Sequence, residues 1–331
     1  MRVLVTGGAG YIGSHTCRLL VESGFDVLIL DSFVKGHRAA IAGLPLVEGS
    51  ITDAGFLSRV FAGEKVDAVI HFAAFIAMGE SVADPAMYYT NNLTGGLTLL
   101  EAAIRAGVKR FVFSSTAGVY GEPSKVPIIE DMPTNPINPY GQTKRDFEVA
   151  LEYCRKAYGL SYAALRYFNA AGAHPDGTMG EDHNPESHLI PCIIKAAMDG
   201  REVGIFGTDY PTPDGTCIRD YIHVLDLARA HILALGVLEG QAGHILNLGN
   251  GRGASVREII DHTDRVSGLK VKVKEQPRRP GDAPVLVASC QKAQETLGWM
   301  SEYADIDTII ETAWRWHSTH KNGYGDTEGR T

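Results

Sequence analysis

The chain has 331 residues, of which 44% are hydrophobic and 21% charged, so it is long enough for about two domains and has the composition of a folded globular protein. Its formal net charge of −8 argues against a general nucleic-acid binder, and it holds no apolar run of about 18 residues, the length that a membrane-spanning helix needs. Its five cysteines are scattered without C-x-x-C spacing, as is typical of free thiols in a reducing compartment, and no leader segment precedes the first strand, so we expect a cytoplasmic protein.

The predicted elements begin with a strand, a glycine-rich turn and a helix. An apolar run at residues 3–6 precedes Gly7, Gly10 and Gly13, and residues 11–22 have the pattern of a helix. Such a turn brings free backbone N–H groups and the positive end of the helix dipole to one point, where a pyrophosphate can bind. Taken alone, the G-x-x-G-x-x-G spacing is also compatible with a plain strand-to-helix turn.

An acidic residue after the next strand favours a dinucleotide site. A second apolar run, residues 27–30, ends in Asp31, 18 positions beyond Gly13. An acidic side chain at about this spacing accepts hydrogen bonds from an adenosine ribose and repels a 2′-phosphate. We therefore predict that the cofactor is NAD rather than NADP, although the cationic Lys35 and Arg38 lie nearby.

Strands and helices continue to alternate through the first half of the chain. We expect strands at residues 46–48, 66–72, 109–114 and 161–166, and helices at residues 85–106 and 140–158. The first of these helices is expected to bury a face formed by Leu93, Leu97, Leu100, Ala103 and Ile104. Near-continuous apolar strands separated by helices predict a doubly wound α/β fold of the Rossmann type, with a parallel sheet covered on both faces. Ligands in such folds bind at the carboxyl ends of the strands.

The pattern changes after residue 169. Residues 171–188 are rich in Gly, His, Pro, Asp and Glu and are expected to form a long loop. Shorter elements follow: helices at residues 189–199, 224–238, 256–266 and 306–317, and strands at residues 203–206 and 245–248. We therefore predict an NAD-binding domain at residues 1–170 and a smaller α/β substrate-binding domain at residues 171–331. Segments near residues 219–250, above all the strand at 245–248, are expected to return to the first sheet, and the polar tail from Lys321 is expected to fray.

The candidate catalytic pair is Tyr140 and Lys144, which lie four positions apart and therefore share one face of a predicted helix. A tyrosine with its ordinary pKa of about 10 is a weak base at pH 7, but a nearby ammonium and an oxidised nicotinamide lower that pKa. An isolated Y-x-x-x-K pattern is more often a solvated helix start. Here, however, the strand at 109–114 ends in Ser114, Ser115 and Thr116, and Thr116 is spaced to hydrogen-bond the same substrate oxygen.

Together, the glycine run, Asp31, the Ser-Ser-Thr strand end and the Tyr140–Lys144 motif resemble the extended short-chain dehydrogenase/reductase family. Further stretches across nearly the whole chain resemble the UDP-hexose 4-epimerases of that family; they are residues 7–17, 71–82, 165–169, 172–175, 205–216, 219–223 and 278–282. The resemblance implies an isomerase of galactose metabolism that binds NAD and a UDP-sugar and forms a homodimer.

The resemblance also implies a mechanism and a set of binding residues. Tyr140 takes the proton of the sugar 4-hydroxyl while a hydride passes to NAD, Lys144 holds the nicotinamide ribose, and Thr116 bridges to the 4-oxygen. The hydride then returns to the other face of the 4-keto sugar. The implied cofactor contacts are Gly7, Gly10, Tyr11, Ile12, Gly13, Asp31, Ser50, Ile51, Phe72, Ala73, Ala74, Asn91, Ser114, Tyr140, Lys144 and Tyr167. The implied substrate contacts are Thr116, Tyr140, Phe168, Asn169, His188, Leu189, Phe206, Arg219, Arg279, Asp282 and Leu286.

Departures from the family pattern leave the substrate and the strength of cofactor binding open. Ser50 stands where the family often has Asp, and Ile76 where Lys is common, so NAD is expected to be held less tightly than in relatives that have both. Leu286 stands where relatives have a bulky Tyr or a small Cys or Ser beside the sugar 2-position. UDP-pentose and UDP-N-acetylhexosamine are therefore alternative substrates. A non-catalytic NAD-sensing protein is disfavoured, because it would not need the tyrosine–lysine pair.

One further group resembles a metal-binding site in composition only. Glu181, Asp182, His183 and His188 lie close together in the sequence, but their spacing fits no common zinc pattern. We therefore predict a solvated loop here and no metal site.

Overall fold

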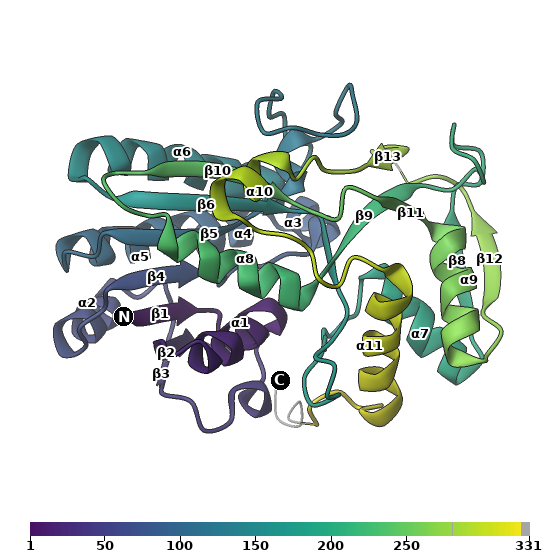
Figure 1. Cartoon of the computed structure of the whole chain (residues 1–331), viewed down its shortest axis with the longest axis horizontal. Coiled ribbons are helices and arrows are strands. Elements are labelled where there is room, and N and C mark those ends of the chain that lie inside the picture. Colours follow the sequence, from purple (N-terminus) through teal and green to yellow (C-terminus); the bar gives the residue numbers. More distant parts are fainter. Residues whose placement is uncertain (280, 326–331) are drawn as a thin grey trace.

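The structure is a computed structural model that describes residues 1–279 and 281–325, and its core is a seven-stranded sheet (Figure 1). The strands run in the order β10-β6-β5-β4-β1-β2-β3, and every pair is parallel. Their bounds are β1 (Arg2–Thr6), β2 (Asp26–Asp31), β3 (Leu46–Glu48), β4 (Ala68–His71), β5 (Arg110–Thr116), β6 (Ser161–Tyr167) and β10 (Gly243–Leu248). The doubly wound α/β fold is therefore confirmed, and the strand predicted at 245–248 does return to the first sheet.

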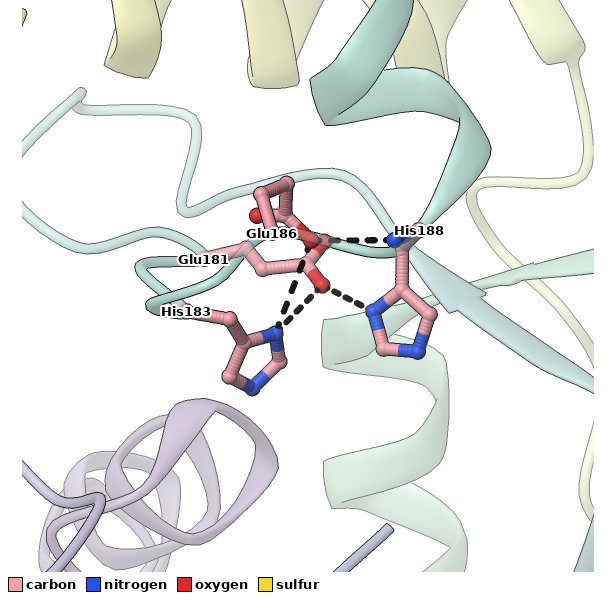
Figure 2. Close-up of side chains that lie close together, drawn as sticks. All are labelled: Glu181, His183, Glu186 and His188. Atoms are coloured by element: carbon pink, nitrogen blue, oxygen red, sulfur yellow. Dashed lines mark hydrogen bonds and ion pairs between the residues drawn. The ribbon is translucent and has the colours of Figure 1, made fainter. Parts of the chain in front are cut away.

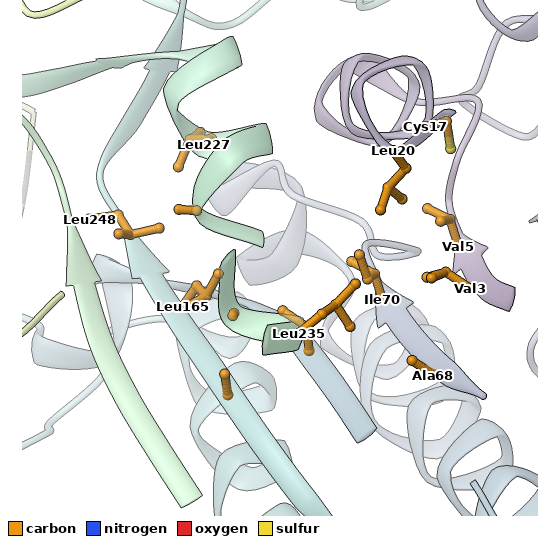
Figure 3. Close-up of a cluster of buried hydrophobic side chains, with 14 of the residues drawn as sticks. Val3, Val5, Cys17, Leu20, Ala68, Ile70, Leu165, Leu227, Leu235 and Leu248 are labelled. Atoms are coloured by element: carbon orange, nitrogen blue, oxygen red, sulfur yellow. The ribbon is translucent and has the colours of Figure 1, made fainter. Parts of the chain in front are cut away.

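Different helices cover the two faces of this sheet. Along β1, Val3 and Val5 lie on one side and Leu4 on the other, as the two-residue period of a strand requires. The first side packs against α1 (Tyr11–Glu22), α8 (Val224–Gly236) and α10 (Gln291–Leu297), and Figure 3 shows part of this cluster. The second side packs against α2 (Ala54–Gly63), α5 (Gly96–Arg105) and α6 (Pro139–Tyr158). Burial on both sides explains why the central strands are almost continuously apolar.

A smaller group of elements lies beyond the carboxyl ends of β5 and β6, on the right of Figure 1. One small sheet contains β7 (Asn169–Ala171), β9 (Ile218–His223), β11 (Gly253–Ser255) and β13 (Val285–Leu286), and β8 (Glu202–Phe206) pairs with β12 (Lys272–Gln276). A separate hydrophobic cluster joins them to α7 (Leu189–Asp199), α9 (Val256–Ser267) and α11 (Ile306–Thr319). The strands β9, β11, β12 and β13 and the helix α10 were not expected from the sequence. The domain boundary near residue 170 stays a prediction.

The helix expected at residues 85–106 is interrupted. It consists of α4 (Pro85–Tyr88), a π-helical segment η2 (Tyr89–Gly95) and α5, and it follows the short α3 (Met78–Ala83). Most of the expected buried face is confirmed, since Leu100 and Ala103 are buried and Leu93 and Ile104 pack against the second cluster, but Leu97 is 39% exposed and Leu99 is fully buried instead. A π-helix has wider turns than an α-helix, so a face traced with the α-helical period leaves its true position.

Two short 3₁₀ segments, η1 (Arg38–Ile41) and η3 (Ala117–Tyr120), complete the described elements. No helix among the described residues is both long and apolar enough to cross a membrane. Fraying was predicted from Lys321, but the Tyr324 N–H donates to Asp182 at 2.9 Å and its ring packs 4.7 Å from that of Trp316; residues 326–331 lie outside the described residues.

Candidate active site

The glycine turn after β1 leaves the start of α1 open to a ligand. Gly7 has a φ of +69°, and a Cβ there would lie 2.5 Å from the Ala73 nitrogen, so a side chain is excluded. A Cβ on Gly13 would lie 2.2 Å from the Gly7 oxygen. Gly10 is the N-cap of α1, and no side chain caps this helix start. The first-turn N–H groups are therefore available to an anion, which suits a pyrophosphate.

Asp31 lies beside this turn at the end of β2. It is 7% exposed, and its carboxylate accepts hydrogen bonds from the backbone N–H groups of Ala9 at 2.9 Å and Phe33 at 2.8 Å. The two cations that complicated the choice of cofactor have other partners. Arg38 is ion-paired with Glu48 and stacks 4.0 Å from the ring centre of Phe33, and Lys35 lies 3.5 Å from the Asn184 carbonyl. These residues therefore fit NAD, which has no 2′-phosphate.

The remaining predicted cofactor residues follow neighbouring strands. The backbone N–H groups of Phe72 and Ala73 donate to the Thr6 carbonyl at 2.9 and 3.1 Å, which brings the end of β4, with Ala74, to the glycine turn. After β3, Ile51 is buried and the Ser50 hydroxyl lies 2.8 Å from that of Thr52. The predicted cofactor residues thus gather where β1, β2, β3 and β4 end.

Two further predicted contacts lie at the edges of this group. Tyr11, at the start of α1 beside Ile12, donates its hydroxyl to the Gly172 carbonyl at 2.6 Å. Asn91 donates to the side chain of Asn92, which is buried and bonds both the N–H and the carbonyl of Phe75. The sequence did not single out Asn92, which fixes the segment after β4.

The predicted catalytic residues meet where β5 ends and α6 begins. The side chain of Asn138 caps α6 by accepting from the Gly141 N–H at 2.8 Å. Lys144 is 3% exposed, its Nζ donates to the Ser114 carbonyl at 2.8 Å, and it lies 5.9 Å from the ring centre of Tyr140. The pKa of Tyr140 is raised above its ordinary value, because its burial outweighs the lowering effect of a hydrogen bond with Thr116. The tyrosine, the lysine and the threonine therefore form one group.

A buried acid extends this group along the same face of α6. The pKa of Lys144 is lowered to about 7, because its burial outweighs the opposing effect of the negative charge of Glu148, one helical turn further along α6. Glu148 accepts a hydrogen bond from Ser115 at 2.5 Å and forms a buried ion pair with Arg166 at 2.6 Å. The sequence analysis missed Glu148 and Arg166, although the spacing Tyr140, Lys144, Glu148 continues the same helical face.

The predicted residues at the end of β6 lie next to this group. The Tyr167 hydroxyl lies 2.5 Å from the Ser114 hydroxyl, and Tyr167 pairs with Thr116 across β5 and β6. Phe168 packs against the small cluster that contains Val119 of η3 and Leu286 of β13. This cluster connects the end of β5 to the second group of elements.

The predicted substrate residues form three groups. Arg219 donates to the Ala283 carbonyl at 2.8 Å, its guanidinium lies 3.4 Å from the Asp282 carboxylate, and it pairs in register with Leu286. The Arg279 guanidinium stacks 3.7 Å from the ring centre of Phe206.

The third group lies along β7 and the start of α7. Asn169 donates its side-chain amide to the Asp220 carbonyl at 2.9 Å. His188 is the N-cap residue of α7, whose first residue is Leu189, and its ring contacts Glu181. The structure thus brings the substrate candidates together in pairs, and the roles assigned to them stay predictions.

Comparisons with known proteins bear on the whole chain. Residues 3–249 match the model of the NAD dependent epimerase/dehydratase family. A UDP-glucose 4-epimerase from Halalkalibacterium halodurans is 52% identical over 98% of both chains. The crystal structure of a UDP-glucose 4-epimerase from Brucella ovis in complex with NAD is 49% identical, with a TM-score of 0.92 over 95% of this chain and 97% of that one. A Bifidobacterium longum UDP-glucose 4-epimerase in complex with NAD⁺ and UDP is 38% identical, with a TM-score of 0.92 over 98% of this chain and 100% of that one.

Proposed function

Because the chain belongs to the NAD dependent epimerase/dehydratase family, we propose that it is an NAD-dependent isomerase that inverts C4 of a UDP-hexose and so interconverts UDP-glucose and UDP-galactose. The observation that carries the proposal is the meeting of Tyr140, Lys144 and Thr116 at the end of β5, in the same parallel sheet whose β1 leads into the glycine turn. The relatives that carry the name UDP-glucose 4-epimerase match this chain over nearly its full length, which supports the same activity.

The side chains of this group account for the proton steps. Tyr140 removes the proton of the sugar 4-hydroxyl and returns it when the 4-keto sugar is reduced, while Thr116 hydrogen-bonds the same oxygen. NAD⁺, held by the glycine turn and Asp31, would supply hydride transfer at C4 and a positive charge that favours the Tyr140 phenolate. Lys144 is held in place by the Ser114 carbonyl, 5.9 Å from the ring centre of Tyr140, and we assign to it the stabilisation of the Tyr140 phenolate.

Inversion requires that the nucleotide stay anchored while the sugar turns. We assign this anchoring to the second group of elements. Arg219 and Arg279 have planar guanidinium groups that suit the pyrophosphate, and Phe206 offers a flat apolar surface for uracil. Asp282 can accept from a ribose hydroxyl, and Asn169 lies just after a strand end. The sugar then contacts mainly the catalytic group and can present either face.

The position and size of Leu286 favour a second candidate substrate. It lies opposite Arg219 and packs against η3, which follows Thr116 directly, so it stands between the nucleotide anchor and the catalytic group. A leucine is smaller than the tyrosine found in some relatives, which leaves more room beside the sugar 2-position. UDP-N-acetylhexosamine is therefore the second candidate substrate, and UDP-pentose, which lacks a C6 group, is the third.

The assembly and the compartment are part of the same proposal. Leu97 of α5 and Val149 and Tyr153 of α6 are exposed apolar side chains on two adjacent helices, and they support a homodimer that buries this surface. All five cysteines are free in the structure, which agrees with a cytoplasmic location.

The test is product identification. The purified protein is incubated with UDP-glucose, UDP-N-acetylglucosamine or UDP-xylose, with and without added NAD, and the 4-epimers are separated by chromatography. We expect UDP-galactose from UDP-glucose. Failure of the NAD-loaded protein to form any 4-epimer would refute the proposal, and epimerisation of UDP-xylose alone would replace the hexose by a pentose.

A further inference from the structure

Four side chains with metal-binding atoms meet in the segment between β7 and α7. Glu181, His183, Glu186 and His188 each offer one ligand atom, and these atoms all lie within 4.8 Å of one another. Figure 2 shows that both imidazole rings turn a nitrogen toward the carboxylate of Glu181. The sequence predicted a solvated loop here. That prediction is wrong for Glu181, which is only 2% exposed.

The contacts inside the cluster place two imidazole nitrogens against carboxylate oxygens. Nδ1 of His188 contacts Oε1 of Glu181, and Nδ1 of His183 lies 3.0 Å from the same oxygen and 3.9 Å from Oε1 of Glu186. Nδ1 of His183 is buried, yet it makes no hydrogen bond within the described part of the chain. A buried imidazole nitrogen that faces two carboxylates without an aligned hydrogen bond to either is available as a metal ligand.

Bonds from outside the cluster hold its members in position. Oε1 of Glu186 accepts from the backbone N–H groups of Ser187 at 2.8 Å and His188 at 3.0 Å. The backbone carbonyl of Glu181 accepts from the Trp316 indole of α11 at 3.0 Å. The four side chains are therefore oriented by the protein before any ion arrives, as supported metal ligands are.

We propose that Glu181, His183, Glu186 and His188 bind one zinc ion. Tetrahedral zinc with bonds of about 2.0 to 2.2 Å places its ligand atoms about 3.3 to 3.6 Å apart, which small side-chain shifts reach from this arrangement. Two imidazole nitrogens with two carboxylate oxygens suit zinc better than magnesium or calcium, which take oxygen ligands.

The ion has a structural role, because protein atoms fill all four positions. It joins the long loop after β7 to the N-cap residue of α7, on the side of the loop where the ring of His183 lies 6.3 Å from that of Tyr11 in α1. The site shares His188 with the predicted substrate contacts but contains none of Tyr140, Lys144 and Thr116, so zinc retention is measured separately from epimerase activity.

The competing explanation is a metal-free ion cluster. Burial lowers the pKa of His183, but the contacts with Glu181 and Glu186 outweigh it and raise the pKa to about 10. Two protonated histidines would then balance two carboxylates without any ion. The two explanations differ in whether the protein takes up zinc.

Metal content of the full chain separates them. The protein is stripped with a chelator, dialysed, supplied with zinc chloride and washed, and the retained zinc is measured by mass spectrometry. We expect one zinc per chain, and a rise in melting temperature of about 4 °C when free zinc is a hundredfold above the Kd. A protein that retains no zinc and shows no such rise overturns the proposal and leaves the ion cluster.

A charge-removing variant locates the ion. Glu186→Gln keeps an oxygen for the two backbone N–H groups but removes the anionic ligand, so we expect zinc affinity to fall at least about 10-fold. The matched control is Glu22→Gln, which makes the same change at an exposed side chain of α1 that pairs with Arg18. Circular dichroism of the metal-free variants verifies folding. Equal zinc affinity in Glu186→Gln and the unaltered protein would place the ion elsewhere and refute this site.

Discussion

Replacing Tyr140 by phenylalanine is the sharpest test of the catalytic group. The change removes one hydroxyl and leaves the ring, the helix cap at Asn138 and the Lys144–Ser114 hydrogen bond in place. Acid–base catalysis by a side chain typically accelerates a reaction by about 10²- to 10⁴-fold, or about 2.7 to 5.4 kcal/mol of activation free energy. We therefore expect the kcat of the variant to fall by at least about 10²-fold, while its KM for UDP-glucose changes little.

The structural cost of this change is much smaller than the catalytic one. The hydroxyl of Tyr140 loses only its hydrogen bond with Thr116, worth about 0.5 to 1.5 kcal/mol, so the melting temperature should fall by no more than about 2 °C. The assay measures UDP-galactose formed from UDP-glucose, and the NAD released on denaturation reports cofactor content. Tyr158→Phe, an exposed tyrosine at the end of the same helix, is the matched control. Turnover within about 10-fold of the unaltered protein, at unchanged NAD content, would refute the reasoning.

Three further outcomes test the cofactor, the substrate and the buried charges. Asp31→Asn removes the charge that repels a 2′-phosphate, so the preference for NADH over NADPH, measured as a ratio of Kd values, should fall at least about 10-fold, and an unchanged ratio would contradict the assignment. Leu286→Tyr should lower the rate with UDP-N-acetylglucosamine relative to UDP-glucose; if the two rates fall together, Leu286 does not control access at the 2-position. Burial lowers the pKa of His231 to about 4, so its contribution to stability is complete above pH 6.5 and is lost as the pH falls toward 4, at about 1.4 kcal/mol per pH unit. His231→Gln should therefore reduce the pH dependence of the unfolding free energy in this range, and equal slopes for the two proteins would count against the burial argument.

The strands of the large sheet were predictable because their signal is local. The runs at residues 3–6 and 27–30 are apolar at every or nearly every position, and strands covered on both faces need that composition. The start of α6 was equally local, since Asn138 both precedes the helix and caps it.

The missed strands lack that signal, for two different reasons. β12 is mostly exposed and carries Lys272, Lys274 and Glu275, so no apolar run marks it. β9 contains Asp220, which is fully buried because backbone N–H groups of residues 250, 251 and 288 bond its carboxylate. Partners 30 and more positions away compensate the charge, and no local pattern reveals them.

The same distinction separates the two halves of the candidate site. Tyr140 and Lys144 were found because four positions on a helix place both side chains on one face. The Arg219–Asp282 contact and the cluster around Glu181 join residues through loops, where sequence spacing has no fixed relation to distance. For the same reason, the regular spacing of known zinc-finger and helix motifs cannot reveal a cluster of this kind.

Retention of the cofactor then depends on a small number of contacts. The Ser50 hydroxyl lies 2.8 Å from that of Thr52, and Ile76, which replaces a cation of the family pattern, is 42% exposed and has no charge to offer. We therefore expect both positions to contribute less to cofactor binding than an aspartate and a lysine would. We propose that the uncapped start of α1 and Asp31, whose carboxylate two backbone N–H groups already orient, carry a correspondingly larger share of NAD binding. A cofactor that is regenerated in each turnover need not leave, so weaker binding at the adenine end is tolerable only while this turn and Asp31 are intact.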